Sequence, residues 1–577
     1  MKFKFNNIRF FLGGSILALG MISCELDDLD INVDPNSASQ ASLELLLTNS
    51  QWEGISTFGG GLNNTTMGFQ AINTSSDDFN FTNSSWNGTW NFLYSGPLKD
   101  LEELIAAADP ETNPKYLGIA QILKAYYFTM MVDLWGDVPY TQAFKGNALG
   151  EEKILEPVYD KGADIYADAF SLIDKGIANL TGTTGTVKGD IIYGGNATKW
   201  IKMANSLKLR LLIQTRNVQS NGAAIQAIVD GGNYIKSAAD DFVLRYGAMK
   251  NPDNRHPMYQ AGYVGGDAGY SYFGHQLMTE MLASKDPRTP FYFKRQTATI
   301  LNPEDPTDKQ TIPCSQRTDC TYGYFPLSNF VAQAVFGKDA SALTSKQAAY
   351  LAGFFGRDRS DPSGIPNDNP LRTTTGAYPG AGLFDATFGT TGGNKYGKGD
   401  GIFPIITSWM TKFYILEAQI TLGVNSGSSD ADLLAAALTD QFAKVWSVGI
   451  AADANAKADV TTWPDNYSQW AVEYKTQSAF IADVKAGYDA TATQNARLGY
   501  VLKQAWKANF GNGFEGYNAF RRTGLPADIQ APMQLPRQYA LSFPYAQDEV
   551  NLNSNTPSKV YDSPSSAVFW DTLKFQF

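Results

Sequence analysis

The sequence predicts a mainly α-helical protein in which helices alternate with long polar loops. In several segments apolar residues recur every three or four positions, so they form a continuous stripe along a helix. Between these segments lie stretches rich in Gly, Ser, Thr, Asp and Pro, at residues 180–195, 247–273, 296–330 and 356–403. Loops longer than about 15 residues are uncommon in compact domains unless they have a function or are disordered. We therefore expect a helical scaffold that carries these loops on one side.

Three predicted helices have both a stripe of apolar residues and residues that are typical of helix ends. The first starts at Asn113 as N-cap, with Pro114 in its first turn, and stops at Gly136. Its stripe consists of Leu117, Ala120, Leu123, Tyr127, Met131 and Leu134. The second starts at Asn196 and has the stripe Trp200, Ala204, Leu207 and Leu211. The third starts at Pro404 and ends at Gly423, with the stripe Ile406, Trp409, Phe413, Leu416 and Ile420. Further helices are predicted at residues 38–54, 90–108, 158–179, 222–230, 274–284, 431–447 and 493–509.

Residues 1–23 have the features of an export signal peptide. Lys2, Lys4 and Arg9 give the start a positive charge, and residues 10–22 are apolar and almost uncharged. This run is shorter than the roughly 20 apolar residues that a membrane-spanning helix needs. A buried N-terminal helix is the alternative, but the basic flank and the small Ser23 at the end of the run favour cleavage.

The stretch that ends in Cys24 resembles a bacterial lipobox, with Met21 in the place of the usual leucine. The cysteine would be acylated and become the mature N-terminus, and several acyl chains would hold it firmly to a membrane. A free thiol without this role is the alternative. The acidic residues that follow, within residues 25–30, resemble a surface-export signal of Bacteroidetes-type lipoproteins, although a charged linker would have the same composition. Both interpretations make residues 24–36 an extended tether.

Charge and cysteine content argue against several classes of function. The 577-residue chain has 46 Lys and Arg against 57 Asp and Glu, and its net charge is -11. No basic run is longer than two residues, which disfavours nucleic acid as a partner. Cys314 and Cys320 are close enough to form a small-loop disulfide, or they are two free thiols. With only His256 and His275 as histidines, no metal site and no cofactor is predicted.

Seven segments, in order along the chain, carry a family resemblance. They are WNFLYSGPLKDLEELI from Trp90, ILKAYYFTMMVDLWGDVPYTQAF from Ile122, NATKWIKMANSLKLRLLI from Asn196, LMTEMLASKDPRTPFYF from Leu277, KFYILEAQITLG from Lys412, FEGYNAFRRTGLP from Phe514 and LPRQYALSFPYAQDEVNLN from Leu535. The sequence LWGDVPY at the end of the predicted helix in the second segment is the most specific. Together with Cys24, these segments make the chain resemble the SusD/RagB family of outer-membrane nutrient-binding lipoproteins.

The resemblance implies a fold, a location and a partner. The fold is a single α-rich domain over residues 37–577, made of tetratricopeptide-like helix pairs that are covered on one side by long loops and short strands. The location is the cell surface, on the outer membrane, where a lipid anchor holds the protein. The partner is a SusC-like TonB-dependent transporter barrel, to which family members deliver captured nutrients. The predicted apolar stripes are compatible with such helix pairs, which bury their faces on one another.

Several residues in the matching segments have a structural interpretation. Gly136 is expected to end a helix. Arg521 and Arg522 are expected to anchor nearby carboxylates. Asp286 and Arg288 are expected to form a local ion pair at a turn.

Two polar loop segments with aromatic residues are the predicted ligand contacts. A sugar presents hydroxyl groups for hydrogen bonds and flat C–H faces that lie on aromatic rings, so its site needs exposed aromatics beside amides or carboxylates. Burial of these aromatics in the core is the alternative. The predicted contacts are Asn83, Trp86 and Asn87 in NFTNSSWNGTW, and Tyr263, Asp267, Tyr270 and Tyr272 in YQAGYVGGDAGYSYF.

Enzyme signals in the sequence are weak. The stretch GNGFEG, with Gly511, Gly513 and Gly516, matches a dinucleotide-binding pattern but follows a predicted helix instead of a strand, so we interpret it as a flexible turn. We predict a non-enzymatic protein that binds an oligosaccharide or polysaccharide for import. The first alternative is the same scaffold binding peptides. The second is a surface glycoside hydrolase, which requires two facing carboxylates about 5–10 Å apart.

Overall fold

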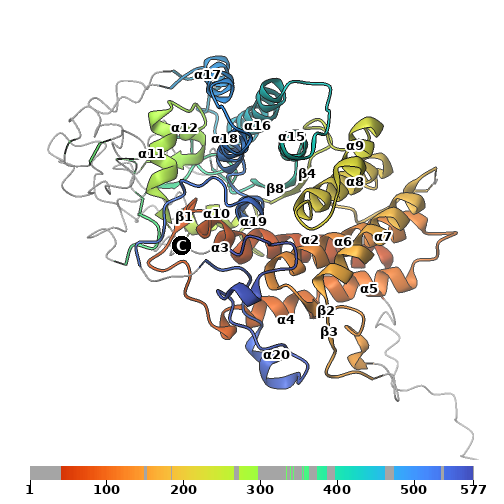
Figure 1. The fold of residues 1–577 in the computed structure, drawn as a ribbon. Helices are drawn as coiled ribbons and strands as arrows, with labels where there is room; N and C mark the ends of the chain where they lie inside the picture. The colour runs from red at the N-terminus through yellow and green to blue at the C-terminus, as the bar shows by residue number, and fades with distance from the viewer. Residues whose placement is uncertain are drawn as a thin grey trace, which may run out of the picture.

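The computed structural model describes residues 41–147, 153–182, 185–264, 272–295, 333, 338–339, 342, 354, 356–362, 373–385, 397–461, 474–534 and 539–575. The predicted signal peptide, Cys24 and the tether lie outside these residues, as do Asp267, Tyr270, Cys314 and Cys320. Within them the protein is mainly helical, as predicted, with a few short strands (Figure 1).

The helices pack against their neighbours along the chain, as expected for helix pairs. In Figure 1 the elements α2, α5, α6 and α7 lie side by side in one half, and α15, α16, α17 and α18 pack together in the other. The helix α8 contacts α7 as well as α15 and so joins the two halves. The N-terminal helices are α2 (Leu43–Thr57), α3 (Asn63–Gly68), α4 (Asn87–Ser95), α5 (Pro97–Ala107), α6 (Pro114–Trp135), α7 (Gly162–Leu180), α8 (Ala197–Gln214) and α9 (Gly222–Gly231). The later helices are α10 (Pro257–Tyr259), α11 (His275–Ala283), α12 (Thr289–Tyr292), α15 (Ser408–Leu422), α16 (Asp430–Ala452), α17 (Gln477–Asp489), α18 (Gln494–Ala508), α19 (Gly513–Thr523) and α20 (Gln547–Leu552).

The helix α6 is the centre of the N-terminal half. From Leu117 to Trp135 every residue except Lys124 is buried, whereas a single stripe was predicted. The difference arises because α6 is packed against α2, α5, α7 and α8, so more than one of its faces is covered. It ends at Gly136, as predicted, whose φ of 79° is in the left-handed region that suits glycine.

Several predicted helices have different boundaries in the structure, and two of them differ for a clear local reason. Residues 90–108 form two helices, because the backbone changes direction at Gly96 and Pro97 starts α5, where its missing N–H has no cost. The helix predicted from Pro404 starts at Ser408 instead. Residues before it form a buried strand, in which β-branched side chains pack well.

Short antiparallel strand pairs join segments that are far apart in the sequence. The pairs are β1 (Asn73–Thr74) with β5 (Tyr272–Phe273), β2 (Val138–Pro139) with β3 (Tyr159–Asp160), β4 (Phe242–Arg245) with β8 (Ile402–Ile406), and β6 (Phe293–Lys294) with β7 (Thr374–Thr375). Two of these pairs hold the segments near residues 73, 272 and 374 in place around one region of the surface.

Buried charges hold the helices in register. Arg288 Nη2 lies 2.5 Å from Asp286 Oδ2, which confirms the predicted local ion pair. Arg522 pairs with Glu417 at 2.8 Å, also as predicted. Arg521 donates to the backbone carbonyls of Asp133 and Leu541. Burial raises the pKa of the nearby Asp571 carboxyl, and the charge of Arg521 opposes part of this rise.

The stretch GNGFEG is not a flexible turn, because Gly513 and Gly516 belong to α19. A Cβ atom at Gly513 would lie 2.3 Å from the backbone nitrogen of Met67 in α3. The glycine therefore permits the close approach of two helices. Among the described helices, none is both long and apolar enough to cross a bilayer.

Candidate ligand-binding site

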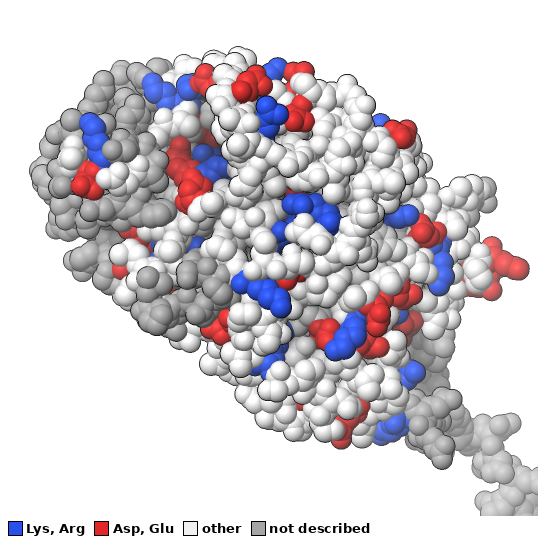
Figure 2. Space-filling view, viewed as in Figure 1, with Lys and Arg blue, Asp and Glu red and all other residues white. Residues whose placement is uncertain are grey.

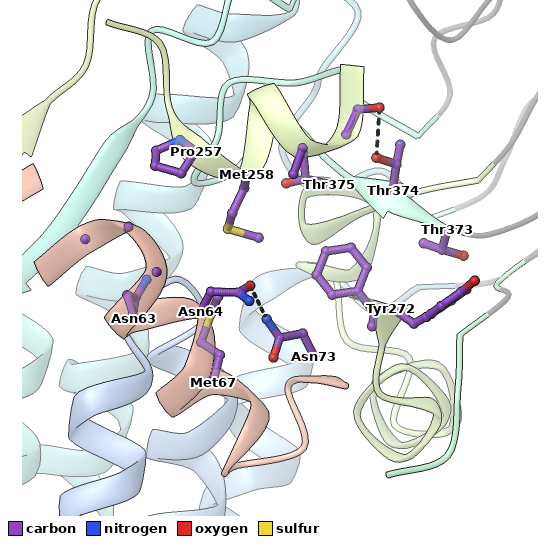
Figure 3. A pocket seen from close by; sticks show the side chains of 16 residues that line it. Asn63, Asn64, Met67, Asn73, Pro257, Met258, Tyr272, Thr373, Thr374 and Thr375 are labelled. Carbon is purple, nitrogen blue, oxygen red and sulfur yellow. Dashed lines mark hydrogen bonds between the residues drawn. The ribbon is translucent and has the colours of Figure 1, made fainter. Parts of the chain in front are cut away.

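A cavity of about 350 Å³ lies between α3 and the π-helix η1 (Phe58–Leu62) on one side, and α10, the π-helix η5 (Gln260–Val264) and β7 on the other. This volume falls in the range of small-molecule sites, about 300–1,000 Å³. Figure 3 shows Met258 extending from α10 toward Asn64 and Asn73. The lining residues are Gly59, Gly60, Gly61, Asn63, Asn64, Met67, Asn73, Pro257, Met258, Ala261, Gly262, Tyr272, Phe273, Thr373, Thr374 and Thr375.

The three glycines of η1 form an open wall. A Cβ atom at Gly60 or Gly61 would meet no other atom within 4 Å, whereas one at Gly59 would lie 2.8 Å from the hydroxyl of Tyr246. Gly59 therefore packs inward, and the other two leave space in front of the backbone. Single π-helical turns such as η1 interrupt the regular backbone hydrogen bonds of an α-helix, and they often occur at functional sites. A ligand can approach the main chain closely here.

Amide groups form the side of the cavity below this wall. The Nδ2 atom of Asn73 donates a hydrogen bond to Oδ1 of Asn64, at a distance of 2.6 Å (Figure 3). This bond links β1 to α3. Asn63 has a structural role, because its Nδ2 donates to the carbonyl of Gly511 and its Oδ1 accepts from the N–H of Gly513. Asn64 is exposed, while Asn63 and Asn73 are buried.

The opposite wall starts at His256, the N-cap residue of α10. Its Nδ1 atom accepts a hydrogen bond of 3.1 Å from the backbone N–H of Met258. Burial lowers the pKa of His256 to about 3, so the imidazole is neutral and can accept this bond. Pro257 and Met258 follow and line the cavity. The cap therefore sets the position of the apolar wall.

The threonines of β7 differ in how their hydroxyls are used. Thr374 donates to the carbonyl of Gly262 at 3.4 Å (Figure 3). Gly262 permits this approach, since a Cβ atom there would lie 2.4 Å from Thr374 Oγ1. Thr375 is only 3% exposed, and its Oγ1 has no hydrogen-bond partner in the structure. A buried hydroxyl without a partner is costly.

The second predicted segment contributes to this cavity, but not with all of its predicted side chains. Tyr272 lines the cavity and is 8% exposed. Tyr263 is buried; its hydroxyl donates to the carbonyl of Thr375 at 2.6 Å and accepts from the N–H of Leu383. It therefore positions β7 and does not offer a stacking surface. Asp267 and Tyr270 lie outside the described residues.

The first predicted segment lies outside the cavity lining, and of its three predicted contacts only Trp86 is buried. Trp86 is 6% exposed and stacks on Phe543 with ring centres 4.6 Å apart. Asn83 donates to the carbonyl of Tyr545, and Asn87 exchanges two hydrogen bonds with Asp548. Trp86 is therefore not the exposed aromatic platform that was expected, because Phe543 and Phe81 pack against its ring. All three side chains attach the C-terminal segment to the scaffold.

Among the described residues that line the cavity there is no Asp, Glu, Lys or Arg. Elsewhere on the face shown in Figure 2, acidic and basic side chains are interspersed and form no continuous basic patch. Among the described residues no cluster of His, Cys, Asp and Glu could hold a metal ion.

Most of the lining residues were missed by the sequence-based prediction. The run STFGGGLNN, which contains Gly59 to Gly61 and both Asn63 and Asn64, was the available signal, since consecutive glycines beside amides permit close ligand approach. Met258, Asn73 and Thr375 gave no local signal, because their meeting depends on strand pairs between distant segments.

Two family models match the chain. Residues 35–313 match a SusD-like model described as starch-binding and associating with the outer membrane. Residues 407–560 match the model of SusD and RagB outer membrane lipoproteins. A comparison with curated proteins finds no match.

Solved structures share the fold over nearly the whole chain. A SusD homolog of Bacteroides fragilis is 16% identical, with a TM-score of 0.60 over 92% of this chain and 99% of that chain. A SusD/RagB family protein of Bacteroides thetaiotaomicron is 19% identical, with a TM-score of 0.62 over 92% and 99%. A chitin-binding protein is 18% identical, with a TM-score of 0.59 over 92% and 100%. At these identities the likeness shows the fold alone.

Proposed function

Because this chain belongs to the SusD/RagB family of outer-membrane lipoproteins, we propose that it binds an oligosaccharide at the cell surface, in the cavity between η1 and β7. The observation that carries the proposal is the composition of this cavity. The amide side chains of Asn64 and Asn73 line it together with the apolar surface of Met258 and Tyr272. Sugars need this combination, since they carry both hydroxyl groups and C–H faces.

The proposed role is capture and delivery. The protein holds its ligand without changing it and passes it to a SusC-like TonB-dependent transporter in the outer membrane. The family description as starch-binding supports a glycan as the ligand, and one neighbour in fold is a chitin-binding protein. Acylation of Cys24, followed by the acidic tether, would place the domain on the outer surface.

A substitution that fills the cavity tests the proposed site. Gly61→Trp introduces a large side chain into open space, so it blocks the cavity without a clash in the scaffold. Gly88→Trp is the matched control, because Gly88 is also exposed, helical and free of neighbours within 4 Å, but lies outside the cavity. We expect Gly61→Trp to abolish retention on affinity gels of neutral polysaccharides, and Gly88→Trp to retain it. Equal retention by the two variants would contradict the proposed site.

A further inference from the structure

A second cavity, of about 500 Å³, lies on another part of the molecule, and we call it the accessory cavity. Its described lining comes from α4 and the start of α5, from the segments after β2 and before β3, and from α20. In Figure 1 the elements α4, β2, β3 and α20 lie below α3 and β1, apart from the cavity between η1 and β7. The volume of the accessory cavity is again within the range of small-molecule sites.

The aromatic rings of Tyr94 and Phe144 line the accessory cavity. Both side chains are half-buried, and their ring centres lie 5.9 Å apart with the ring planes tilted by 36°. The hydroxyl of Tyr94 donates to the carbonyl of Pro139 at 2.7 Å, which fixes the position of its ring. Leu155 also lines the cavity and is 72% exposed. The accessory cavity therefore offers flat apolar surface to a ligand.

The backbone at Phe144 is a second observation that points to a ligand. Its φ is 65°, which is in the left-handed region. Among the described non-glycine residues with positive φ, Phe144 is the only aromatic one. This conformation is an outlier for a bulky side chain, and it costs free energy. Strain of this kind is concentrated at ligand-binding positions, and here it holds an aromatic ring at the wall of a cavity.

Polar side chains of α4 line the same space. Asn91 is three residues before Tyr94 and four before Ser95, so the three side chains share one face of the helix. Asn91 and Ser95 are exposed, and both can exchange hydrogen bonds with a ligand. The Nδ2 atom of Asn91 donates to Asp548 Oδ2 at 2.8 Å, which holds the amide in place. The accessory cavity thus combines an amide and a hydroxyl with apolar rings, the combination that a sugar needs.

We propose that the accessory cavity binds a second stretch of the same polysaccharide molecule that the cavity between η1 and β7 holds. The inference rests on the proposed function and deepens it, because it makes the ligand a long chain that is bound at two places. Asn73 lines one cavity and Asn91 the other. The backbone between these two residues spans at most about 65 Å when fully extended, so one polysaccharide molecule can reach both cavities.

The accessory cavity is expected to bind weakly by itself. The hydroxyl of Tyr94 and the Nδ2 atom of Asn91 already donate within the protein, so ring contacts provide most of the attraction. Once the cavity between η1 and β7 holds a chain, the second contact becomes intramolecular. Linked contacts of this kind raise the affinity by about 10²–10⁴-fold over either site. The accessory cavity therefore acts on polysaccharides and not on oligosaccharides that fill one cavity.

The dependence of binding on chain length tests the inference. Dissociation constants are measured for a hexasaccharide and the polymer of the same sugar: maltohexaose with amylose, xylohexaose with soluble xylan, and mannohexaose with soluble mannan. Ser95→Trp fills the accessory cavity. Ser447→Trp is the matched control, because Ser447 is also an exposed helical serine but lines neither cavity. A polymer offers many registers to any site, so the comparison is made between variants and not between ligands.

For the pair that the parent protein binds, Ser95→Trp should weaken binding of the polymer at least about tenfold and leave binding of the hexasaccharide unchanged. Ser447→Trp should change neither. Polymer binding that is unchanged in Ser95→Trp, or that falls equally in both variants, would overturn the inference and leave the proposed function intact. A hexasaccharide that is lost with Ser95→Trp and retained by Gly61→Trp would contradict the proposed site as well. A parent protein that binds none of the pairs contradicts the proposed function itself.

Phe144 provides a test that does not fill the accessory cavity. Phe144→Leu keeps an apolar side chain at the same position but removes the flat ring, whereas Phe144→Tyr keeps the ring. We expect Phe144→Leu to weaken binding of the polymer about fivefold, with no effect on the hexasaccharide, and Phe144→Tyr to bind both as the parent does. A ring with a purely structural role would instead lower the melting temperature of Phe144→Leu and leave polymer binding unchanged. That result would overturn the role of this ring in the accessory cavity.

Discussion

Trp86 illustrates how single aromatic side chains connect the C-terminal segment to the scaffold. Its indole ring lies between Phe81 and Phe543, with ring centres 5.8 and 4.6 Å away. The indole nitrogen is buried without a hydrogen-bond partner. The side chain therefore contributes through apolar packing, since its polar group is not satisfied.

Replacement of Trp86 by alanine should destabilise the protein by about 3–5 kcal/mol, because it leaves a large cavity in the core. Chemical denaturation measures this loss. Trp86→Phe, the matched control, keeps the ring stack and removes the unpaired N–H, so it should cost much less. Folded Trp86→Ala protein should still be retained on neutral glycan gels. A specific loss of retention at full stability would return Trp86 to the ligand site.

His256 gives the wall beside the cavity a dependence on pH. Burial lowers its pKa to about 3, whereas the same group in the unfolded chain titrates near 6.5. Between these values the unfolded chain binds more protons, so acidification through this window destabilises the folded state. Above pH 6.5 the imidazole is neutral in both the folded and the unfolded chain, so His256 no longer lowers the stability of the folded state.

The variant His256→Asn should reduce this acid sensitivity, because asparagine can still cap α10 but does not titrate. We expect the stability lost per pH unit within the window to be smaller than in the parent by about 1.4 kcal/mol, the value for one proton. Urea midpoints measured across the window give this slope. His275, whose pKa is also lowered by burial, remains in both proteins and serves as an internal reference. Identical slopes in the two proteins would contradict the assignment.

At the scale of elements, buried ion pairs connect helices from both halves of the molecule. Glu417 of α15 accepts from Arg522 of α19 and from Arg216, which follows α8, each at 2.8 Å. Burial raises the pKa of Glu417, but the two arginines lower it more, to about 2. The stability from this group is therefore present above its unfolded pKa near 4.5 and is lost as the pH falls toward 2.

Glu417→Gln should cost about 3–5 kcal/mol, since it leaves two arginines near the core without their partner. The surface pair of Lys99 and Glu103 is the control, because both side chains are about half exposed and solvent screens their attraction. Glu103→Gln should change the midpoint of guanidinium unfolding little. A similar small change for Glu417→Gln would show that the buried pairs do not hold α8, α15 and α19 together.

At the scale of the whole molecule, the cavity is assembled from segments that are far apart in the sequence. Its described walls come from residues 59–73, 257–262, 272–273 and 373–375, which the pairs β1–β5 and β6–β7 help to bring together. Helical elements and short strands both contribute to the lining, since α3 and α10 supply side chains beside those of β1, β5 and β7.

The proposed cell-surface location depends on Cys24, and its replacement tests this. Cys24→Ala should abolish the incorporation of a labelled fatty acid and move the protein from the membrane fraction to the soluble fraction, because the acyl chains provide the attachment. Binding of neutral glycans by the released domain should not change, since the cavity lies in the folded part. Labelling that persists in Cys24→Ala would contradict acylation at this residue.

The sequence by itself determined the helices, most of their ends and the family, because apolar periodicity and end signals are local properties of the chain. It also predicted the pair of Asp286 and Arg288, whose members are neighbours. Only the tertiary structure decided that Trp86 and Tyr263 are buried and that Asn64, Met258 and Thr375 share one cavity. Exposure and convergence depend on which distant segments pack together, and no local pattern records that.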